Sequence, residues 1–87
     1  MPEISRFYGL IIYMYAKDHK PPHFHAKYAE FWAEISIITG EIIEGSLPNR
    51  ALRLIAEWIE LHKSELLENW NESIKENPNF KLIEPLD

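Results

Sequence analysis

The sequence contains no cysteine, only three glycines and no long hydrophobic run. Without cysteine, the chain forms no disulfide, no thiolate metal site and no cysteine nucleophile. The longest apolar run, Leu10–Tyr15, is far shorter than the ~20 residues that cross a bilayer. The first residues also lack the basic and apolar segments of a secretion signal. We therefore expect a cytoplasmic protein with no membrane contact.

The chain does contain enough apolar material for one small domain. Hydrophobic residues make up 46% of the 87 residues and aromatic residues 13%, which is typical of a folded protein rather than a disordered one. A chain of this length has no room for a second hydrophobic core. We therefore expect residues 1–87 to form a single domain.

Charge is distributed unevenly along the chain, whose net charge is −5. Residues 1–40 carry four basic and four acidic groups, whereas residues 41–87 carry five basic and ten acidic groups. Broad nucleic-acid binding requires Lys and Arg side chains that face phosphates. The charge balance therefore argues against a broad RNA-binding surface, and it leaves open a small local site near Lys17, Lys20 and Lys27.

The first half of the chain shows the patterns of β-strands. Phe7–Tyr15 is mostly apolar at odd and even positions alike, so both faces of a strand formed by it would be apolar. This pattern predicts a central strand covered on both faces. His23–Tyr28 alternates between apolar and polar residues, so its apolar residues should face the core and its histidines the wetter side. Phe31–Ile38 predicts a third strand and Glu41–Gly45 a short fourth. These segments predict an antiparallel sheet of three or four strands with short connections.

The second half predicts one long helix, from about Asn49 to Asn71, followed by an extended tail. The tail, Asn77–Asp87, contains too much proline for a helix, and its Phe80–Ile83 segment should add an edge strand or lie along the domain. The predicted fold class is therefore α+β, with one helix packed on a small sheet whose exposed edge would allow oligomers to form. The apolar stripe of the helix consists of Leu52, Ile55, Ile59, His62, Leu66 and Trp70.

The chemically active residues are concentrated in the segment Asp18–His25, which contains three histidines and two prolines. His23 and His25 are two positions apart on a predicted strand, so both side chains project from one face. His19 precedes the stiff Pro21-Pro22 turn and could approach the same site. His62 occupies the apolar stripe of the helix, an unusual place for a titratable side chain without a partner. If the helix packs so that His62 meets the strand pair, three imidazoles converge.

Such a cluster could bind a divalent metal ion. Zinc takes three or four ligands at ~2.0–2.1 Å, and imidazole is among its preferred donors. On this interpretation the ligands are His23, His25 and His62, with Glu34 on the neighbouring strand as the carboxylate. The cofactor would be a divalent metal such as zinc.

The same histidines could instead act in general acid–base catalysis, because the pKa of histidine lies close to cellular pH. His23 and His25, with His62 if it converges, would then cleave RNA: one imidazole deprotonates the 2′-hydroxyl and the other protonates the leaving oxygen. The chain has few Arg and Lys side chains to stabilise the transition state of that reaction.

A third interpretation assigns no chemistry to the cluster. His62 would be a core histidine that hydrogen-bonds a backbone carbonyl or Glu34. The histidine strand would form a docking edge for a protein partner, together with His19 and the rigid Pro21-Pro22 turn. Trp70 would be an anchor of the core or of that interface.

Three segments of the chain resemble a bacterial family called domain of unknown function 4160: residues 1–28, residues 45–70 and the ending Ile83–Leu86. The hallmarks of that family are the Asp18–His25 block and a helical block in which His62, Leu66 and Trp70 follow at intervals of four. This sequence matches both blocks at each position. The resemblance therefore marks His23, His25, His62 and Trp70 as more than chance features.

The resemblance also implies a partner, although it implies no reaction, substrate or cofactor. Genes of this family often stand beside a gene of the family called domain of unknown function 2442, a layout similar to that of toxin–antitoxin modules. We therefore expect a component of a toxin–antitoxin-like pair that binds the product of the neighbouring gene. Its functional site would be the surface formed by His23, His25 and His62.

Overall fold

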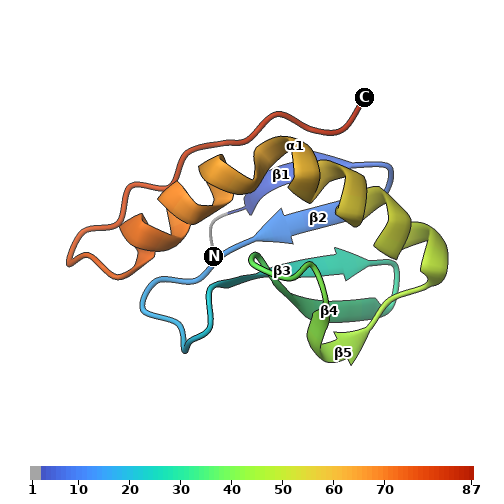
Figure 1. Cartoon of the computed structure of the whole chain (residues 1–87), viewed down its shortest axis with the longest axis horizontal. Coiled ribbons are helices and arrows are strands. Elements are labelled where there is room, and N and C mark those ends of the chain that lie inside the picture. The colour runs from blue at the N-terminus through green and yellow to red at the C-terminus, as the bar shows by residue number, and fades with distance from the viewer. Residues whose placement is uncertain (1–2) are drawn as a thin grey trace.

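The computed structural model describes residues 3–87 and shows one five-stranded sheet with one long helix packed on it (Figure 1). The strands lie in the sheet in chain order, and each neighbouring pair is antiparallel. The α+β class and the meander are therefore confirmed, with five strands instead of three or four. The elements are β1 (Glu3–Phe7), β2 (Leu10–Tyr13), β3 (His23–Tyr28), β4 (Phe31–Ser36), β5 (Ile42–Ser46) and α1 (Asn49–Ser73).

The additional strand comes from the segment Phe7–Tyr15, which is not one central strand. β1 ends at Phe7 and β2 begins at Leu10, and between them Tyr8 and Gly9 form a two-residue turn with φ angles of 49° and 85°. Two positive φ angles match the twist of a tight antiparallel hairpin. Because β1 and β2 both contribute buried residues next to this turn, hydrophobic residues continue across it and resemble a single strand.

The remaining strands lie close to their predicted positions. β3 has the predicted bounds, His23–Tyr28. β4 begins at Phe31 as expected and ends at Ser36, two residues before the predicted end. β5 spans Ile42–Ser46 and is offset by one residue from the prediction. A register shift between Glu34 and Ile35 makes a bulge where β5 pairs with β4.

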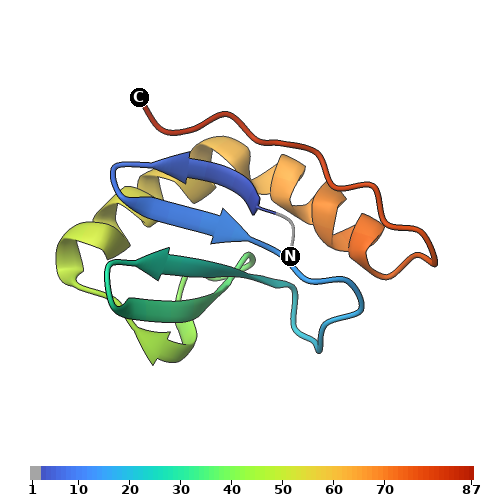
Figure 2. The same cartoon turned by 180° about the vertical axis from the view of Figure 1, so that it is seen from behind.

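The helix α1 covers one face of the sheet, where the hydrophobic core lies. Trp58 is fully buried, and its ring centroid is 5.2 Å from that of Phe7 and 5.8 Å from that of Phe24. These contacts join the helix to β1 and β3. The opposite face of the sheet has no element over it in Figure 2, which views the molecule from behind.

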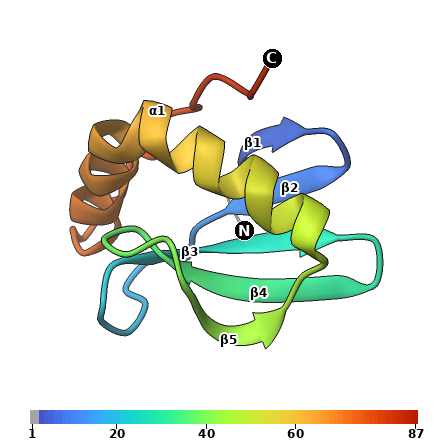
Figure 3. The same cartoon turned by 45° about the vertical axis from the view of Figure 1, so that its right-hand side comes forward.

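The helix changes direction at His62, whose φ of −127° and ψ of 19° are not helical. Figure 3 shows the bend, since the yellow and orange parts of α1 run in different directions. The part after the bend reaches the loop that follows β2, where the backbone N–H of Lys17 donates to the carbonyl of Ser73 at 2.8 Å. The bend therefore carries the last turns of α1 to the histidine-containing segment.

The tail is extended along α1 and β1 (Figure 1), as predicted. The side chain of Asn69 accepts from the N–H of Lys81 and donates to its carbonyl, both at 2.9 Å. The indole of Trp58 donates to the carbonyl of Glu84 at 2.8 Å, and the N–H of Ile83 donates to the carbonyl of Ile4 at 2.8 Å. Phe80–Ile83 thus lies along the domain without forming a strand. Among the residues described, no helix has the length and apolar character to span a membrane.

Candidate functional site

The loop between β2 and β3 folds back over the start of β3 and places Asp18 at the centre of the histidine cluster. The Oδ2 atom of Asp18 lies 3.1 Å from Nε2 of His23 and 2.9 Å from Nε2 of His25. Its Oδ1 atom accepts the backbone N–H of His19 at 2.8 Å. Asp18 therefore connects three histidines from a position that the sequence patterns did not identify as a site residue.

His23 lies at the buried end of this cluster. Its side chain has no exposed surface, and its ring packs 5.2 Å from the ring of Trp70 on α1. The prediction that His23 faces the wetter side is therefore wrong, because the part of α1 beyond the bend covers it. Its Nδ1 lies 2.8 Å from the carbonyl of Pro21. A carbonyl only accepts, so Nδ1 carries the hydrogen and Nε2 points toward the carboxylates.

Glu34 supplies the second carboxylate from β4, where it stands opposite His25 in the strand register. Its Oε1 atom is 3.4 Å from Nε2 of His23 and 3.2 Å from Nε2 of His19. Its side chain is 9% exposed, and Oε1 is buried without a hydrogen-bond partner. A buried acceptor without a hydrogen bond is costly, so Oε1 marks a place where a cation or a polar ligand would fit.

His25 is held between Asp18 and two tyrosines. The ring of Tyr13 stacks on His25 with centroids 5.3 Å apart, and the ring of Tyr15 meets it edge-on at 4.6 Å. Burial raises the pKa of Tyr13, and the neighbouring Tyr15 raises it further. These contacts fix the ring of His25 so that its Nε2 faces Asp18.

His19 is the exposed member of the cluster, with 57% of its side chain accessible. Its Nδ1 lies 3.2 Å from the carbonyl of Lys20, and this hydrogen bond is the main reason that the pKa of His19 is raised, with Asp18 and Glu34 adding to it. Burial acts to raise the pKa of Asp18, but hydrogen bonds from His25 and the His19 backbone, together with the nearby imidazoles of His23 and His25, lower that pKa on balance.

The donor atoms of the cluster form two sets of three that share His23. One set is Asp18, His23 and His25, and the other is His19, His23 and Glu34; within each set the donor atoms lie within 4.8 Å of one another. Four donors at ~2.0–2.1 Å around a tetrahedral ion would be about 3.3 Å apart. The four distances from imidazole nitrogens to carboxylate oxygens within the sets, 2.9–3.4 Å, are close to that spacing, and the nitrogens of each imidazole pair lie within 4.8 Å of each other. The arrangement can therefore bind a metal ion with small adjustments.

The other predicted site residues differ in whether they contact this cluster. Neither donor set includes His62, whose Nδ1 lies 2.6 Å from Oε1 of Glu65, three residues later on α1, while its ring packs 5.8 Å from Trp58. Trp70 contacts the cluster through His23. The carbonyl of Pro21 orients His23, and that of Pro22 accepts the N–H of Ile37 at 3.1 Å.

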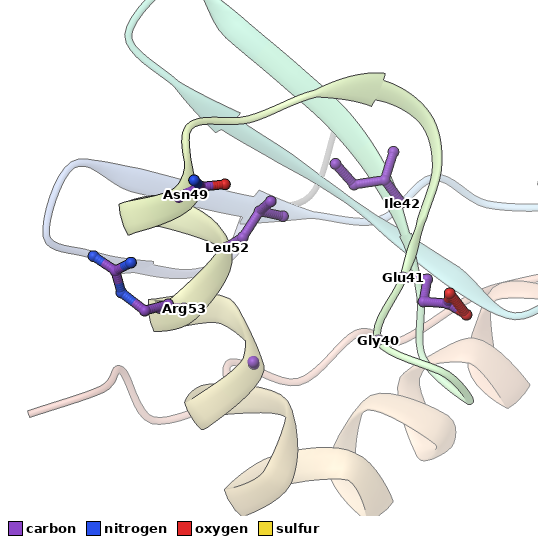
Figure 4. A pocket seen from close by; sticks show the side chains of 7 residues that line it. Gly40, Glu41, Ile42, Asn49, Leu52 and Arg53 are labelled. Atoms are coloured by element: carbon purple, nitrogen blue, oxygen red, sulfur yellow. The ribbon is translucent and has the colours of Figure 1, made fainter.

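A separate groove lies between α1 and the segment that leads into β5 (Figure 4). It contains no histidine, and Leu52 and Ile42 extend toward each other across it. The groove therefore offers none of the acid–base or metal chemistry of the cluster. Its lining residues are Gly40, Glu41, Ile42, Asn49, Leu52, Arg53 and Ala56.

Comparison with known proteins assigns the family without assigning a reaction. No curated protein and no solved structure matches the chain. The family model described as Domain of unknown function (DUF4160) matches residues 9–71, which is well over half of the chain and includes every residue of the cluster. The chain therefore belongs to the DUF4160 family.

Proposed function

We propose that this protein binds one divalent transition-metal ion through Asp18, His23 and His25, with Glu34 and His19 beside the ion. The observation that carries the proposal is the orientation of His23. Because Nδ1 of His23 donates to the carbonyl of Pro21, Nε2 faces the carboxylates of Asp18 and Glu34 at 3.1 and 3.4 Å. A nitrogen lone pair that faces two carboxylates is unfavourable, and a metal ion bound between these atoms would remove that repulsion.

The surroundings of His23 match those of a metal ligand in other respects. Histidines that bind metals usually donate their second ring N–H to a carbonyl or carboxylate, which fixes the tautomer and the ring orientation. His23 does this with Pro21, and Nδ1 of His19 lies 3.2 Å from the carbonyl of Lys20. Imidazole and carboxylate donors without sulfur suit Zn²⁺ or Fe²⁺. We therefore use Zn²⁺ as the test ion.

Metal-independent RNA cleavage by His23 and His25 receives less support from the geometry. An acid–base pair must contact its substrate, yet the side chain of His23 is completely buried and both ring nitrogens already face protein atoms. The pairing with a neighbouring-gene product is a separate prediction that follows from the family resemblance. Growth of cells expressing this chain, with and without the neighbouring gene, tests that prediction.

The metal proposal is tested by stripping the purified protein with a chelator, titrating it with Zn²⁺ by calorimetry and measuring bound zinc by elemental analysis. We expect one ion per chain. His23→Ala should weaken binding by more than about 100-fold, the upper range for loss of a partner that only orients a ligand. His62→Ala is the matched control, because it also removes one imidazole but lies outside both donor sets.

Two results would contradict the proposal. One is a wild-type chain that takes up no stoichiometric zinc, nickel or iron. The other is a His62→Ala variant that loses the ion as completely as His23→Ala does, since the ion would then lie elsewhere. Far-UV circular dichroism of each variant separates loss of the site from loss of the fold.

A further inference from the structure

Glu34 has a buried carboxylate oxygen and is not one of the three proposed metal ligands. Its Oε1 has no hydrogen bond of good geometry, although it lies 3.2 Å from Nε2 of His19 and 3.4 Å from Nε2 of His23. Nε2 has a single lone pair, so His23 can bind only one ion. If that ion takes Asp18, His23 and His25, as proposed above, Glu34 stands directly beside it.

Three protein ligands leave at least one coordination position for water, which is the arrangement of catalytic rather than structural zinc sites. The carboxylate of Glu34 is then placed to accept a proton from that water. Because the rest of the cluster is mostly buried, bulk water does not compete for Oε1. General bases within hydrogen-bond reach of the attacking water typically contribute 10²–10⁴-fold in rate.

His19 connects Glu34 to the solvent. Its Nε2 lies 3.2 Å from Oε1 of Glu34, and 57% of its side chain is accessible. The other ring nitrogen, Nδ1, is held near the carbonyl of Lys20. A proton on Glu34 therefore has one short step to an imidazole that exchanges directly with bulk water.

The basic residues of the β2–β3 loop and of β3 favour an anionic substrate. Lys17 and Lys20 flank the exposed part of the loop, and Lys27 is two residues from His25 on the same strand. All three side chains are exposed, and none forms an ion pair with any residue described. Glu44, which is exposed and stands opposite Glu34 on β5, disfavours a doubly charged group. A singly charged phosphate diester fits this combination.

Resting on the proposed metal site, we propose that the protein hydrolyses phosphate diesters, with Glu34 as the general base and His19 as the proton exit. Glu34 takes one proton from water, and the hydroxide forms a bond to phosphorus. The bond from phosphorus to one ester oxygen breaks, and that oxygen leaves as the alcohol or alkoxide, which takes up a proton if it is basic enough. The products are a phosphate monoester and an alcohol, with no change of oxidation state.

The test uses chelator-stripped protein reloaded with Zn²⁺ and bis(4-nitrophenyl) phosphate as the probe, with released 4-nitrophenolate measured by absorbance. Wild-type protein should turn the probe over. Glu34→Gln, which preserves the size of the side chain, should keep one ion per chain and lose about 100-fold or more of kcat. His23→Ala, purified in parallel, reports any contaminating phosphodiesterase, and His62→Ala should retain turnover.

The outcomes separate the two proposals. A chain that binds no ion overturns both. A chain that binds the ion without hydrolysing the probe overturns only the hydrolase, as does a Glu34→Gln variant that keeps both ion and turnover. If Glu34→Gln loses the ion, Glu34 is a ligand that closes the site, and the base assignment is wrong.

Discussion

The face of the sheet under α1 and the face turned away from it use the same strands but contain different chemistry. Under the helix, Phe24 and Ile35 are completely buried and belong to a continuous apolar core. On the opposite face, the neighbouring residues His25 and Glu34 belong to a polar cluster that the β2–β3 loop and the last turns of α1 cover in part. Successive residues of β3 and β4 point to opposite faces of the sheet. A residue that stabilises the fold is therefore directly next, in the sequence, to one that could perform chemistry.

The largest expected effect is on the covered face. Trp58→Ala should reduce the free energy of unfolding by about 3–5 kcal/mol, because it removes a fully buried ring that contacts Phe7 and Phe24 and a hydrogen bond to the tail. Trp32→Ala is the matched control on the open face, where the residue is 48% exposed, and should cost about 1 kcal/mol. Urea denaturation midpoints provide the measurement. If both variants lose the same free energy of unfolding, the two faces contribute equally to stability and the comparison is wrong.

A metal ion should make the open face contribute to stability as well. If Zn²⁺ binds the folded chain only, a free concentration of about 100 times Kd adds about 2.7 kcal/mol to the free energy of unfolding. This gain should disappear in Asp18→Asn, which removes a charged donor but keeps the shape of the side chain. Thermal unfolding with and without Zn²⁺ measures it. A gain that persists in Asp18→Asn would place the ion outside this cluster.

The smallest expected effect is the pH dependence of the metal-free protein. Although burial opposes the change, hydrogen bonds from His25 and the His19 backbone lower the pKa of Asp18. A lowered carboxyl pKa contributes stability above the unfolded value of ~3.9, and that contribution is lost as the pH falls through the folded pKa. Asp18→Asn should therefore flatten the acid side of the stability profile in chelator, as followed by urea midpoints. An unchanged acid limb would contradict this.

His19 should act in the opposite pH window. The Lys20 carbonyl, together with Asp18 and Glu34, raises the pKa of His19. A raised imidazole pKa contributes stability below the unfolded value of ~6.5, and the contribution is lost as the pH rises through the folded pKa. His19→Gln should therefore alter the profile near neutral pH and leave the acid limb alone. If it instead alters only the acid limb, the assignment is wrong.

Sequence patterns predicted those elements of the fold whose hydrophobic residues repeat with the period of a strand or a helix. The alternation of β3 gave its bounds, His23–Tyr28, and the 3-4 spacing gave the start of α1 and its end to within two residues. The pattern failed at Tyr8-Gly9, because hydrophobic residues on both sides conceal a turn whose first residue is a tyrosine with positive φ. The bend at His62 was also missed, since neither proline nor glycine occurs there.

The arrangement of the cluster could be predicted from the sequence only for its strand residues, since only these follow a period. The spacing of His23 and His25 on a strand indicated a shared face, and the neighbouring strand indicated Glu34. The burial of His23 depends on Trp70, which is distant in the sequence and reaches it only because α1 bends. The role of Asp18 depends on how an irregular loop folds back, which no periodicity describes. The one feature of the sequence that could have indicated Asp18 as a site residue is its position at the start of the histidine block.

The tail that crosses β1 has a consequence for how the chain is made. β1 is synthesised well before the tail, so its carbonyl at Ile4 has to remain unpaired until the N–H of Ile83 is available. Until then, a nascent chain presents an unpaired strand edge of the kind that recruits other extended segments. β5, at the other side of the sheet, is short and bulged and contains Glu44, so it is less receptive to such pairing. Protection of this edge during synthesis therefore depends on the tail around Ile83.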